Sequence, residues 1–268
     1  MTTPPMPTRR FDVELSDAQV EFFRARGFLA LERITTDEEV AWLGAVYDGL
    51  FATNSGQFDV TRPYGSRAEH QLSQLLFPEQ RVPELRETNY YRNARRAISR
   101  LLGVDEAKLE GWGHMLRKPP NGGHLTPWHQ DEAYWEPDFD YFASAAWLPL
   151  EDVDMRNGCM CFLPGSQVGP VLAHHHYGGD PAVHLLEVDE RPDESRAVPV
   201  PLRVGGATFH HPRTLHATAP NSTERPRRAW ANEFQLPPQR RATRANRPWV
   251  DEGKQALAEA LSAAPRQR

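Results

Sequence analysis

The first hundred residues carry the hydrophobic spacing and end signals of helices. In SDAQVEFFRARG, Ser16 and Gln19 form a capping box, and apolar residues follow in one stripe. Gly27 is expected to end this helix, and the FLAL run after it predicts a short strand. A second helix is predicted behind Thr36, because Glu39 can reach back to it and apolar residues then repeat at helical spacing.

Less regular stretches flank these two helices. Residues 1–10 are rich in proline and threonine and predict a disordered tail. Residues 52–68 are polar and contain glycine, so they predict a loop. Residues 69–102 predict further helix, with breaks near Pro78 and Pro83.

From about residue 111 onward, the pattern changes to short β-rich runs separated by Gly, Pro, Asn and Asp. Gly205 and Gly206 lie between PLRV and ATFHH and predict a hairpin. Many short strands with regular turns are typical of a sandwich, barrel or jelly roll. Residues 165–197 contain few strand signals, and a long connection of this kind often covers a functional site.

The chain has 268 residues and no linker-like stretch in its middle, which favours one domain with a sizeable core. We expect this domain to span residues 11–248. Its helical part would extend to about residue 110 and its β-rich core would cover about 111–236. A short helix and a tail are predicted within residues 249–268.

Composition excludes several function classes. The net charge of −5 and the pI near 6.1 give no electrostatic footprint for nucleic acid. No run of about 18 apolar residues occurs, so we expect no membrane span, and the first residues lack the apolar core of a secretory signal. Cys159 and Cys161 are interpreted as small apolar strand residues, and a reducing cytoplasm is the expected location.

The stretch PWHQDEAYW places His129 and Asp131 two residues apart. On a strand, both side chains would point to the same side of the sheet. An imidazole nitrogen and a carboxylate oxygen then supply two ligands of a metal site. The pair alone is weak evidence, because most such pairs are ordinary surface or hydrogen-bonded residues.

A third ligand must come from one of the other histidines. His216 lies on a strand-like run after a Pro-Arg turn, a position that suits a rigidly held ligand. Residues 174–176 are three adjacent histidines, and three neighbouring side chains cannot all converge on one ion. We interpret that run as part of a polar surface loop. His210 and His211 end the ATFHH strand.

With these residues in place, the chain resembles the phytanoyl-CoA dioxygenase family of iron(II)- and 2-oxoglutarate-dependent oxygenases. The family pattern is H-x-D, a distant His and then an Arg, and here it falls on His129, Asp131, His216 and Arg227. The segments RKPPNGGHLTPWHQD, NGCMCFLPGSQVG and HATAPNSTERPRRA are similar to family segments, with Gln167 replacing the usual His. The resemblance extends over nearly the whole chain.

The resemblance implies an α+β, mainly β fold: a double-stranded β-helix (jelly roll, cupin-like) with N-terminal helices packed against it. It also implies that His129, Asp131 and His216 bind Fe(II), with 2-oxoglutarate as cosubstrate and O2 as oxidant. Two of the ligands are neutral and one is a carboxylate, so the metal centre keeps a net positive charge that favours a dianionic cosubstrate.

Further residues are expected around the cosubstrate. Arg227 would bind its far carboxylate, because the planar guanidinium suits a bidentate contact, and Thr218 would be a second donor. Trp147 and His114 are candidate lining residues of the same pocket. Arg225 and Arg228 are the alternatives to Arg227, and Arg225 would share its side of a regular strand.

The implied reaction is oxidation, most simply hydroxylation, of an unactivated C–H bond in a small organic molecule, with conversion of 2-oxoglutarate to succinate and CO2. Asp131 argues against a related iron halogenase, which needs that carboxylate removed. No nucleic-acid or membrane partner is expected, and the oligomeric state is left open. The basic residues of YYRNARRAISRLL are interpreted as a solvated helix face rather than a CoA site.

Two alternatives remain at this point. The first is a cupin-type metal-dependent isomerase or hydrolase that does not use 2-oxoglutarate. The second is a binding module on a degenerate jelly roll. A complete set of His129, Asp131, His216 and Arg227 disfavours both alternatives.

Overall fold

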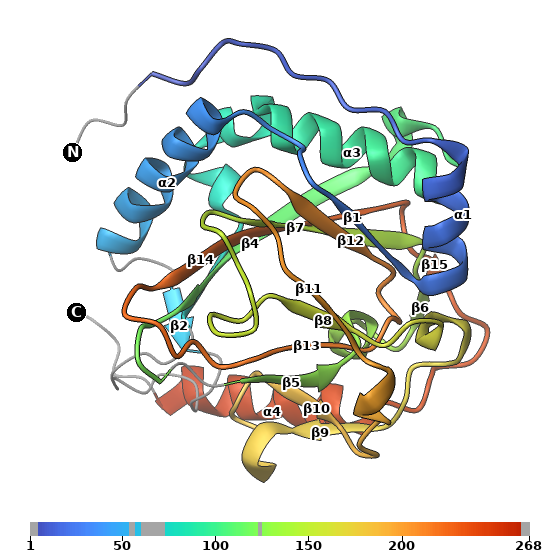
Figure 1. The fold of residues 1–268 in the computed structure, drawn as a ribbon. Coiled ribbons are helices and arrows are strands. Elements are labelled where there is room, and N and C mark those ends of the chain that lie inside the picture. The colour runs from blue at the N-terminus through green and yellow to red at the C-terminus, as the bar shows by residue number, and fades with distance from the viewer. Residues whose placement is uncertain (1–4, 54–56, 60–72, 123–124, 264–268) are drawn as a thin grey trace.

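Two antiparallel β-sheets face each other in the computed structural model, which describes residues 5–53, 57–59, 73–122 and 125–263 (Figure 1). The major sheet contains, in order across it, β1 (Phe28–Leu31), β12 (Ala207–His210), β7 (Ala143–Pro149), β14 (Arg227–Gln235), β4 (Glu110–Lys118), β3 (Ser73–Leu76) and β2 (Gln57–Asp59). The minor sheet contains β11 (Val198–Val200), β8 (Met160–Phe162), β13 (His216–Thr218) and β5 (Thr126–His129).

The chain crosses repeatedly from one sheet to the other. It runs from β5 in the minor sheet to β7 in the major sheet and returns to β8 and β11 in the minor sheet. It then crosses to β12 in the major sheet, back to β13 in the minor sheet, and again to β14 in the major sheet. This alternation makes a double-stranded β-helix, so the predicted fold class is confirmed. It also brings β5 and β13 together as neighbours although 86 residues separate His129 from His216.

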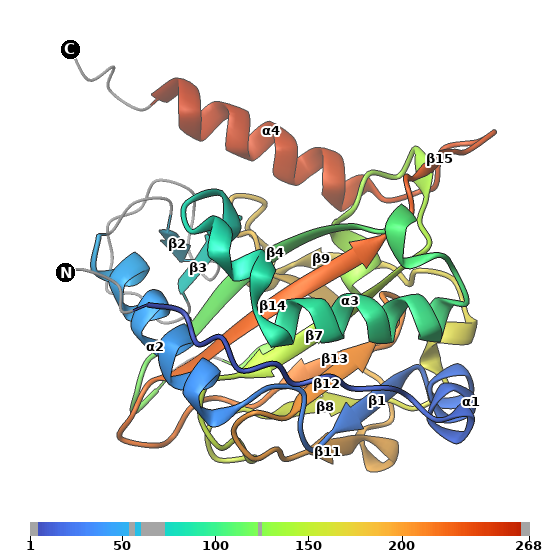
Figure 2. The same ribbon diagram turned by 90° about the horizontal axis from the view of Figure 1, so that it is seen from above.

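Helices cover the outer face of the major sheet (Figures 1 and 2). They are α1 (Asp17–Arg26), α2 (Asp37–Ala52) and α3 (Asn89–Leu102). Side chains alternate along β14, so Trp230 and Phe234 pack among the helices, while Ala229 and Ala231 face the minor sheet. The inner face of the major sheet is therefore available to form a site between the two sheets.

The C-terminal helix α4 (Pro248–Ala263) lies on the opposite side of the molecule, outside the minor sheet (Figure 1). Trp249 and Val250 at its start pack with Ala133 and Leu186. Two small pairings complete the fold: β9 (His174–His176) with β10 (Leu186–Val188), and β6 (Phe139–Asp140) with β15 (Gln239–Arg240).

Several local predictions are confirmed. Ser16 and Gln19 form the capping box of α1, and Gly27 ends that helix in the left-handed conformation at φ 81°. Thr36 caps α2, and α4 covers the residues predicted as a C-terminal helix. The expected domain boundaries stay a prediction, and residues 1–4 of the expected tail lie outside the described residues.

Other local predictions are wrong. Residues 73–76 form a strand rather than a helix, because Leu75 is buried and the segment pairs with β4. Helix α3 begins only at Asn89, after short 3-10 turns at Pro78 and Pro83. Strand β2 lies within the predicted 52–68 loop, whose residues 54–56 and 60–68 fall outside the described parts.

The predicted hairpin at Gly205-Gly206 is also wrong. Strand β11 before it belongs to the minor sheet, and β12 after it belongs to the major sheet. The turn therefore carries the chain between the sheets rather than reversing it within one. Gly205 adopts φ 87°, and its carbonyl accepts a hydrogen bond from the backbone of Ile34, which fixes the crossing beside β1.

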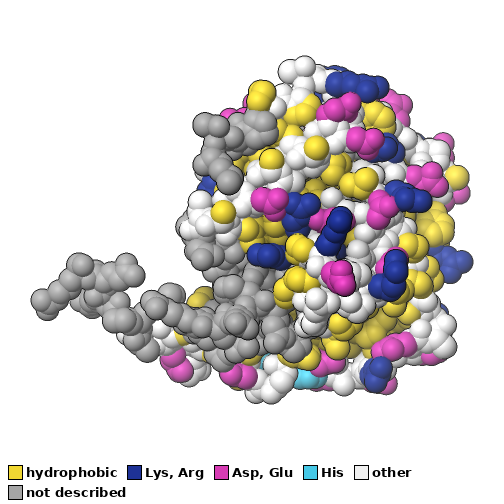
Figure 3. Space-filling model, turned by 60° about the vertical axis from the view of Figure 1, so that its left-hand side comes forward, with side chains coloured by type: hydrophobic (Ala, Val, Ile, Leu, Met, Phe, Trp, Pro, Cys, Tyr) yellow, Lys and Arg dark blue, Asp and Glu magenta, His cyan; other side chains and the backbone are white. Residues whose placement is uncertain are grey.

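One face of the molecule shows how its surface charges are distributed. On the face shown in Figure 3, Lys and Arg side chains are interspersed with Asp and Glu rather than gathered into a basic patch. None of the helices that the structure describes is long and apolar enough to cross a membrane.

A buried carboxylate joins the helices to the β-body. Glu39 of α2 is 1% exposed and accepts hydrogen bonds from the backbone N–H groups of Asn89 (2.7 Å) and Tyr90 (2.9 Å) at the start of α3. A helix N-terminus has unpaired N–H groups and favours negative charge. Tyr90 in turn donates its hydroxyl to the carbonyls of Ala146 and Trp230 in the major sheet.

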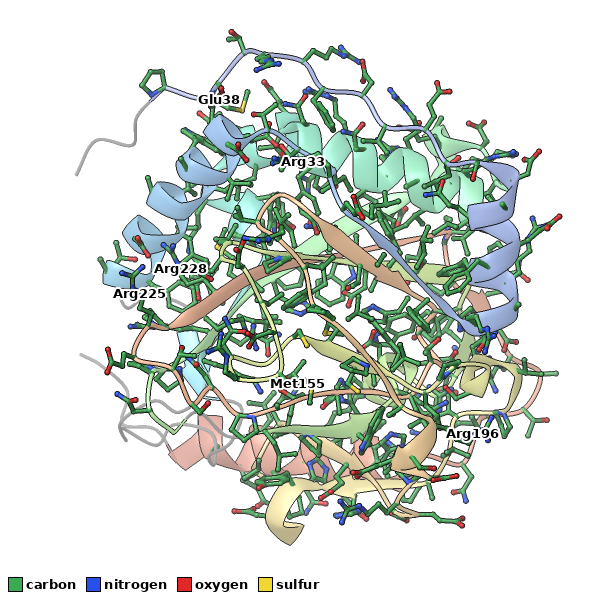
Figure 4. The ribbon with its side chains drawn as sticks, viewed as in Figure 1. Arg33, Glu38, Met155, Arg196, Arg225 and Arg228 are labelled. Atoms are coloured by element: carbon green, nitrogen blue, oxygen red, sulfur yellow. The ribbon has the colours of Figure 1, made fainter. Side chains whose placement is uncertain are left out.

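Replacing Glu39 with alanine should therefore destabilise the fold. Glu39→Ala leaves two buried N–H groups without an acceptor, and we expect the free energy of unfolding to fall by about 2–3 kcal/mol in urea denaturation. Glu38→Ala is the control, since Glu38 is an exposed neighbour on the same helix (Figure 4) and should change little. Equal losses in both variants would contradict the capping role.

Candidate active site

Three predicted ligands converge between the two sheets. His129 ends β5, and His216 begins β13 directly opposite it in the strand pairing. The Nε2 atoms of His216 and His129 lie 3.4 and 3.7 Å from Oδ1 of Asp131. One ligand atom from each of the three residues falls within 4.8 Å of the other two, a spacing that can hold a metal ion.

The route by which Asp131 reaches this position differs from the prediction. Strand β5 stops at His129, and Asp131 is the first residue of a 3-10 turn, Asp131–Tyr134. Gln130 fixes the change of direction: its side chain donates to the carbonyl of Arg213 (2.7 Å) and accepts from the N–H of Leu172 (2.7 Å). The prediction that His129 and Asp131 lie on one strand is therefore wrong, although the two side chains do approach each other.

The two imidazoles present their Nε2 atoms as acceptors. Nδ1 of His129 donates to the carbonyl of Pro127 (2.8 Å), and Nδ1 of His216 donates to that of Thr214 (2.9 Å). Because a carbonyl can only accept, the proton is on Nδ1 and the lone pair of Nε2 is free for a metal. Burial lowers the pKa of His129 to about 3, and nearby His216 adds to the effect, so the ring is neutral.

A third histidine orients the carboxylate. His210, at the end of β12, lies with its Nε2 atom 2.8 Å from Oδ2 of Asp131, which leaves Oδ1 toward His129 and His216. Burial alone would raise the pKa of Asp131, but His216 and His210 outweigh it and hold the pKa well below its usual value. No role was predicted for His210, because only the register of β12 against β7 shows that its side chain points between the two sheets.

The 3-10 turn that carries Asp131 is held by a buried ion cluster. Glu132 is fully buried and accepts from Arg213 (2.6 and 3.2 Å) and from Arg247 (2.7 Å). Arg247, just before α4, is 3% exposed and also donates to the Glu132 carbonyl. The cluster ties the turn to the loop before β13 and to the C-terminal segment.

Arg227 lies at the start of β14, inside the sheets, and is 3% exposed. Its Nε and Nη1 atoms are buried without a hydrogen-bond partner in the described part of the chain. Burial lowers the pKa of Arg227 to about 10, so the guanidinium stays charged at neutral pH. It lies over the Trp147 ring at 5.5 Å. A buried cation of this kind calls for an anionic partner.

The two neighbouring arginines are placed differently (Figure 4). Arg228 is bound through its side chain to Glu151 and to Asp48, the latter at 2.9 Å. Arg225 is exposed and precedes the first residue of β14, so strand alternation does not apply to it. Of the three candidates, Arg227 is the one that faces the interior.

A cavity of about 320 Å³ joins the three ligands to Arg227. Thr218, Trp147 and His114 line it, as expected, and the Thr218 hydroxyl donates to that of Thr126 (2.9 Å). Lys118 is the strand partner of Arg227 but donates to the carbonyls of Thr218 and Ala219 across the sheets. Sequence analysis did not single out Lys118.

The predicted covering segment contributes less than expected. Of residues 165–197, His184 and Leu185 line the cavity. His174 and His176 instead donate from Nδ1 to the carbonyls of Leu172 and Val183. His175 is half exposed and pairs with Asp189. The run is strand β9, in which His174 and His176 are buried, so the prediction of a surface loop is wrong for these two residues.

Comparison with known proteins is consistent with this geometry. A model of the family "Phytanoyl-CoA dioxygenase (PhyH)" matches residues 23–229. The chain belongs to the phytanoyl-CoA dioxygenase family. Its members are non-haem oxygenases, and the cofactors are Fe(II), 2-oxoglutarate and O2, for which the His-Asp-His cluster offers a metal site.

A solved structure of EvdO2 from Micromonospora carbonacea var. aurantiaca in complex with 2-oxoglutarate is 36% identical, with a TM-score of 0.81, and the match covers 91% of this chain and all of that one. Phytanoyl-CoA dioxygenase domain-containing protein 1 of Bos taurus is 28% identical over 50% of this chain and 47% of its own length. A probable alpha-ketoglutarate-dependent hypophosphite dioxygenase of Stutzerimonas stutzeri is 35% identical over 39% and 37%. The chain thus spans less than half the length of these curated relatives.

The Glu132 cluster can be tested by removing its charge. Glu132→Gln leaves the buried Arg247 without a full counter-charge, and we expect the free energy of unfolding to fall by about 3 kcal/mol in urea denaturation. Glu136→Gln is the matched control, because Glu136 pairs with Lys254 at the exposed surface and its loss should cost under about 1 kcal/mol. Similar losses in the two variants would contradict the anchoring role.

Proposed function

We propose that this chain uses Fe(II), 2-oxoglutarate and O2 to hydroxylate an unactivated C–H bond of a small organic molecule. The observation that supports this best is the pairing, within one cavity, of a metal-binding cluster with the buried and unpaired Arg227 guanidinium. A metal hydrolase or isomerase has no need of that second feature, since its substrate need not carry a distant carboxylate.

His129, Asp131 and His216 would bind Fe(II) on one face. Such a facial set of two His and one carboxylate leaves coordination positions open for a cosubstrate and O2. The iron supplies the oxidation in which 2-oxoglutarate becomes succinate and CO2 while one oxygen atom enters the substrate. His210 keeps Oδ2 of Asp131 occupied, so Oδ1 stays directed at the metal position.

Arg227 would bind the far carboxylate of 2-oxoglutarate. The unpaired Nε and Nη1 atoms show that the buried guanidinium has donors left for a ligand. A planar guanidinium can bind a carboxylate in a bidentate contact. The Thr218 hydroxyl, on β13 close to His216, would donate to the cosubstrate after turning away from Thr126. Trp147 lines the cavity beside Arg227. His114 lines the same cavity from β4, but it pairs with Ala231 and so lies nearer to Glu233 than to Arg227.

Asp131 argues for oxygen insertion rather than halogenation. Its carboxylate would take the coordination position that a halide would need. The ionised state of Asp131, held by His216 and His210, also supplies a negative charge beside the metal.

Replacing Arg227 with lysine should weaken 2-oxoglutarate binding. Arg227→Lys exchanges a planar fork for a point charge, so we expect the apparent KM for 2-oxoglutarate, measured by succinate release, to rise about tenfold to hundredfold. The same substitution one residue on, Arg228→Lys, is the control, because Arg228 is bound to Glu151 and Asp48. An unchanged KM in Arg227→Lys would move the role to Arg225 or Arg228.

The reaction itself is tested by isotope labelling. With 18O2, we expect each succinate formed with substrate to accompany one product molecule that carries one labelled oxygen atom. His216→Ala should abolish this turnover by removing a metal ligand, whereas His175→Ala, an exposed histidine, should retain it. A product without added oxygen would contradict hydroxylation, and full activity of His216→Ala would contradict the metal assignment.

A further inference from the structure

A row of residues on the inner face of the major sheet leads away from the metal cluster. Strand pairing places Trp112, Glu233, Ala145 and His210 side by side on β4, β14, β7 and β12. Neighbouring strands are about 4.8 Å apart, so the backbone positions of Glu233 and His210 are about 10 Å apart. The small Ala145 side chain lies between them and leaves open space above it in the cavity.

This end of the cavity is remote from the cosubstrate contacts. Along β14, Glu233 lies six residues from Arg227, which corresponds to about 20 Å of strand. A 2-oxoglutarate molecule bound between the metal cluster and Arg227 therefore extends away from Glu233. The Glu233 side chain is available to the other reactant.

Two buried polar groups at this end have no partner inside the described chain. Glu233 is 5% exposed, and its Oε2 atom is buried without a hydrogen bond. His114 lies diagonally across from it on β4, and its Nδ1 atom is likewise unpaired. Buried polar atoms are normally hydrogen-bonded, and both of these side chains line the cavity. A bound molecule would provide the missing hydrogen-bond partners.

The surrounding walls are aromatic. The Trp112 ring lies between Phe77 and His114, with ring centroids 5.6 and 5.7 Å away, and Tyr134 and Trp135 line the cavity as well. Such flat apolar faces suit the stacking of a ring.

Positive charge is scarce in the same cavity. Arg227 is the one lysine or arginine among the described lining residues, and 2-oxoglutarate would neutralise it. The basic residues of α3 are outside: Arg96 and Arg100 pair with Asp12 and Asp17 on the helical side of the major sheet. Among the described lining residues, an anionic substrate would find no further counter-charge.

We propose that the substrate is a small ring compound, uncharged or cationic, that donates an O–H or N–H hydrogen bond to Glu233, and that anions such as acyl-CoA thioesters are not substrates. The ring would lie over Ala145 between Glu233 and the metal, enclosed by the aromatic residues of the cavity. The inference rests on the proposed function, since it takes the metal end of the cavity as the reacting end.

Three probes with the same ring test this substrate class. They are trans-1,2-cyclohexanediol, cyclohexylamine and cyclohexanecarboxylate, titrated by calorimetry into anaerobic protein loaded with Fe(II) and 2-oxoglutarate. We expect the diol, the amine or both to bind and the carboxylate to bind at least about tenfold more weakly. Tighter binding of the carboxylate, or no binding of any probe to the loaded protein, would overturn the proposal.

Variants at position 233 identify the contact and separate the two donors. Glu233→Leu should weaken binding of the preferred probe about tenfold or more by removing the acceptor. Burial, with nearby Asp131, raises the pKa of Glu233 well above its usual value, so binding of an ammonium would have to ionise this carboxyl. Glu233→Gln keeps an acceptor oxygen but cannot ionise, so binding of a hydroxyl should largely survive and binding of an ammonium should not. Glu110→Leu, an exposed change on the adjoining strand, is the control.

Unchanged probe binding in Glu233→Leu would contradict the assignment of Glu233 as the hydrogen-bond partner of the substrate. Failure of the proposed function is distinguishable, because wild-type protein would then not take up Fe(II) and 2-oxoglutarate in the loading step. Normal loading of Glu233→Leu shows that this variant is folded, so a loss of probe binding would report on the substrate end alone.

Discussion

The pairing of β13 with β5 is the constraint on which the rest of the site depends. It sets His216 directly opposite His129, with ring centroids 4.2 Å apart, and both rings are buried. Two imidazole Nε2 atoms so close together suit a shared cation, and Asp131 supplies a carboxylate oxygen to the same position. The Glu132 cluster and the His210 contact both serve to keep that carboxylate in place.

The cavity is polarised along the inner face of the major sheet. Arg227 marks one end, the metal cluster occupies the middle, and Glu233 marks the other end. The residue proposed to bind the cosubstrate and the residue proposed to bind the substrate thus lie at opposite ends of the same strand, β14. Outward-facing residues of the same strand, Trp230 and Phe234, pack among the helices and hold this spacing rigid.

Local signals in the sequence predicted what depends on near neighbours. The caps at Ser16 and Thr36 and the left-handed Gly27 need only residues a few positions away, and they occur as predicted. The H-x-D motif identified two candidate ligands, although the strand assumed for Asp131 is a 3-10 turn. The family resemblance pointed to His216 and Arg227, which no local rule distinguishes from other histidines and arginines.

Features that depend on strand register could not be predicted from the sequence. His210 and Glu233 are both interior residues of one row, but the row exists only because β12, β7 and β14 pair as they do. The Gly205-Gly206 turn failed as a hairpin for the same reason, since tertiary pairing decides which sheet each flanking strand joins. Strand β3 was missed because its pairing with β4 and β2, rather than its own residues, makes it a strand.

The most direct measurement is the visible difference spectrum of anaerobic protein after addition of Fe(II) and then 2-oxoglutarate. An open iron site that binds the cosubstrate through two oxygens should give a metal-to-ligand charge-transfer band that requires both additions. The account predicts this band in the wild-type protein. Absence of the band, with tightly bound zinc found in its place, would contradict the account and favour a cupin-type metal enzyme that does not use 2-oxoglutarate.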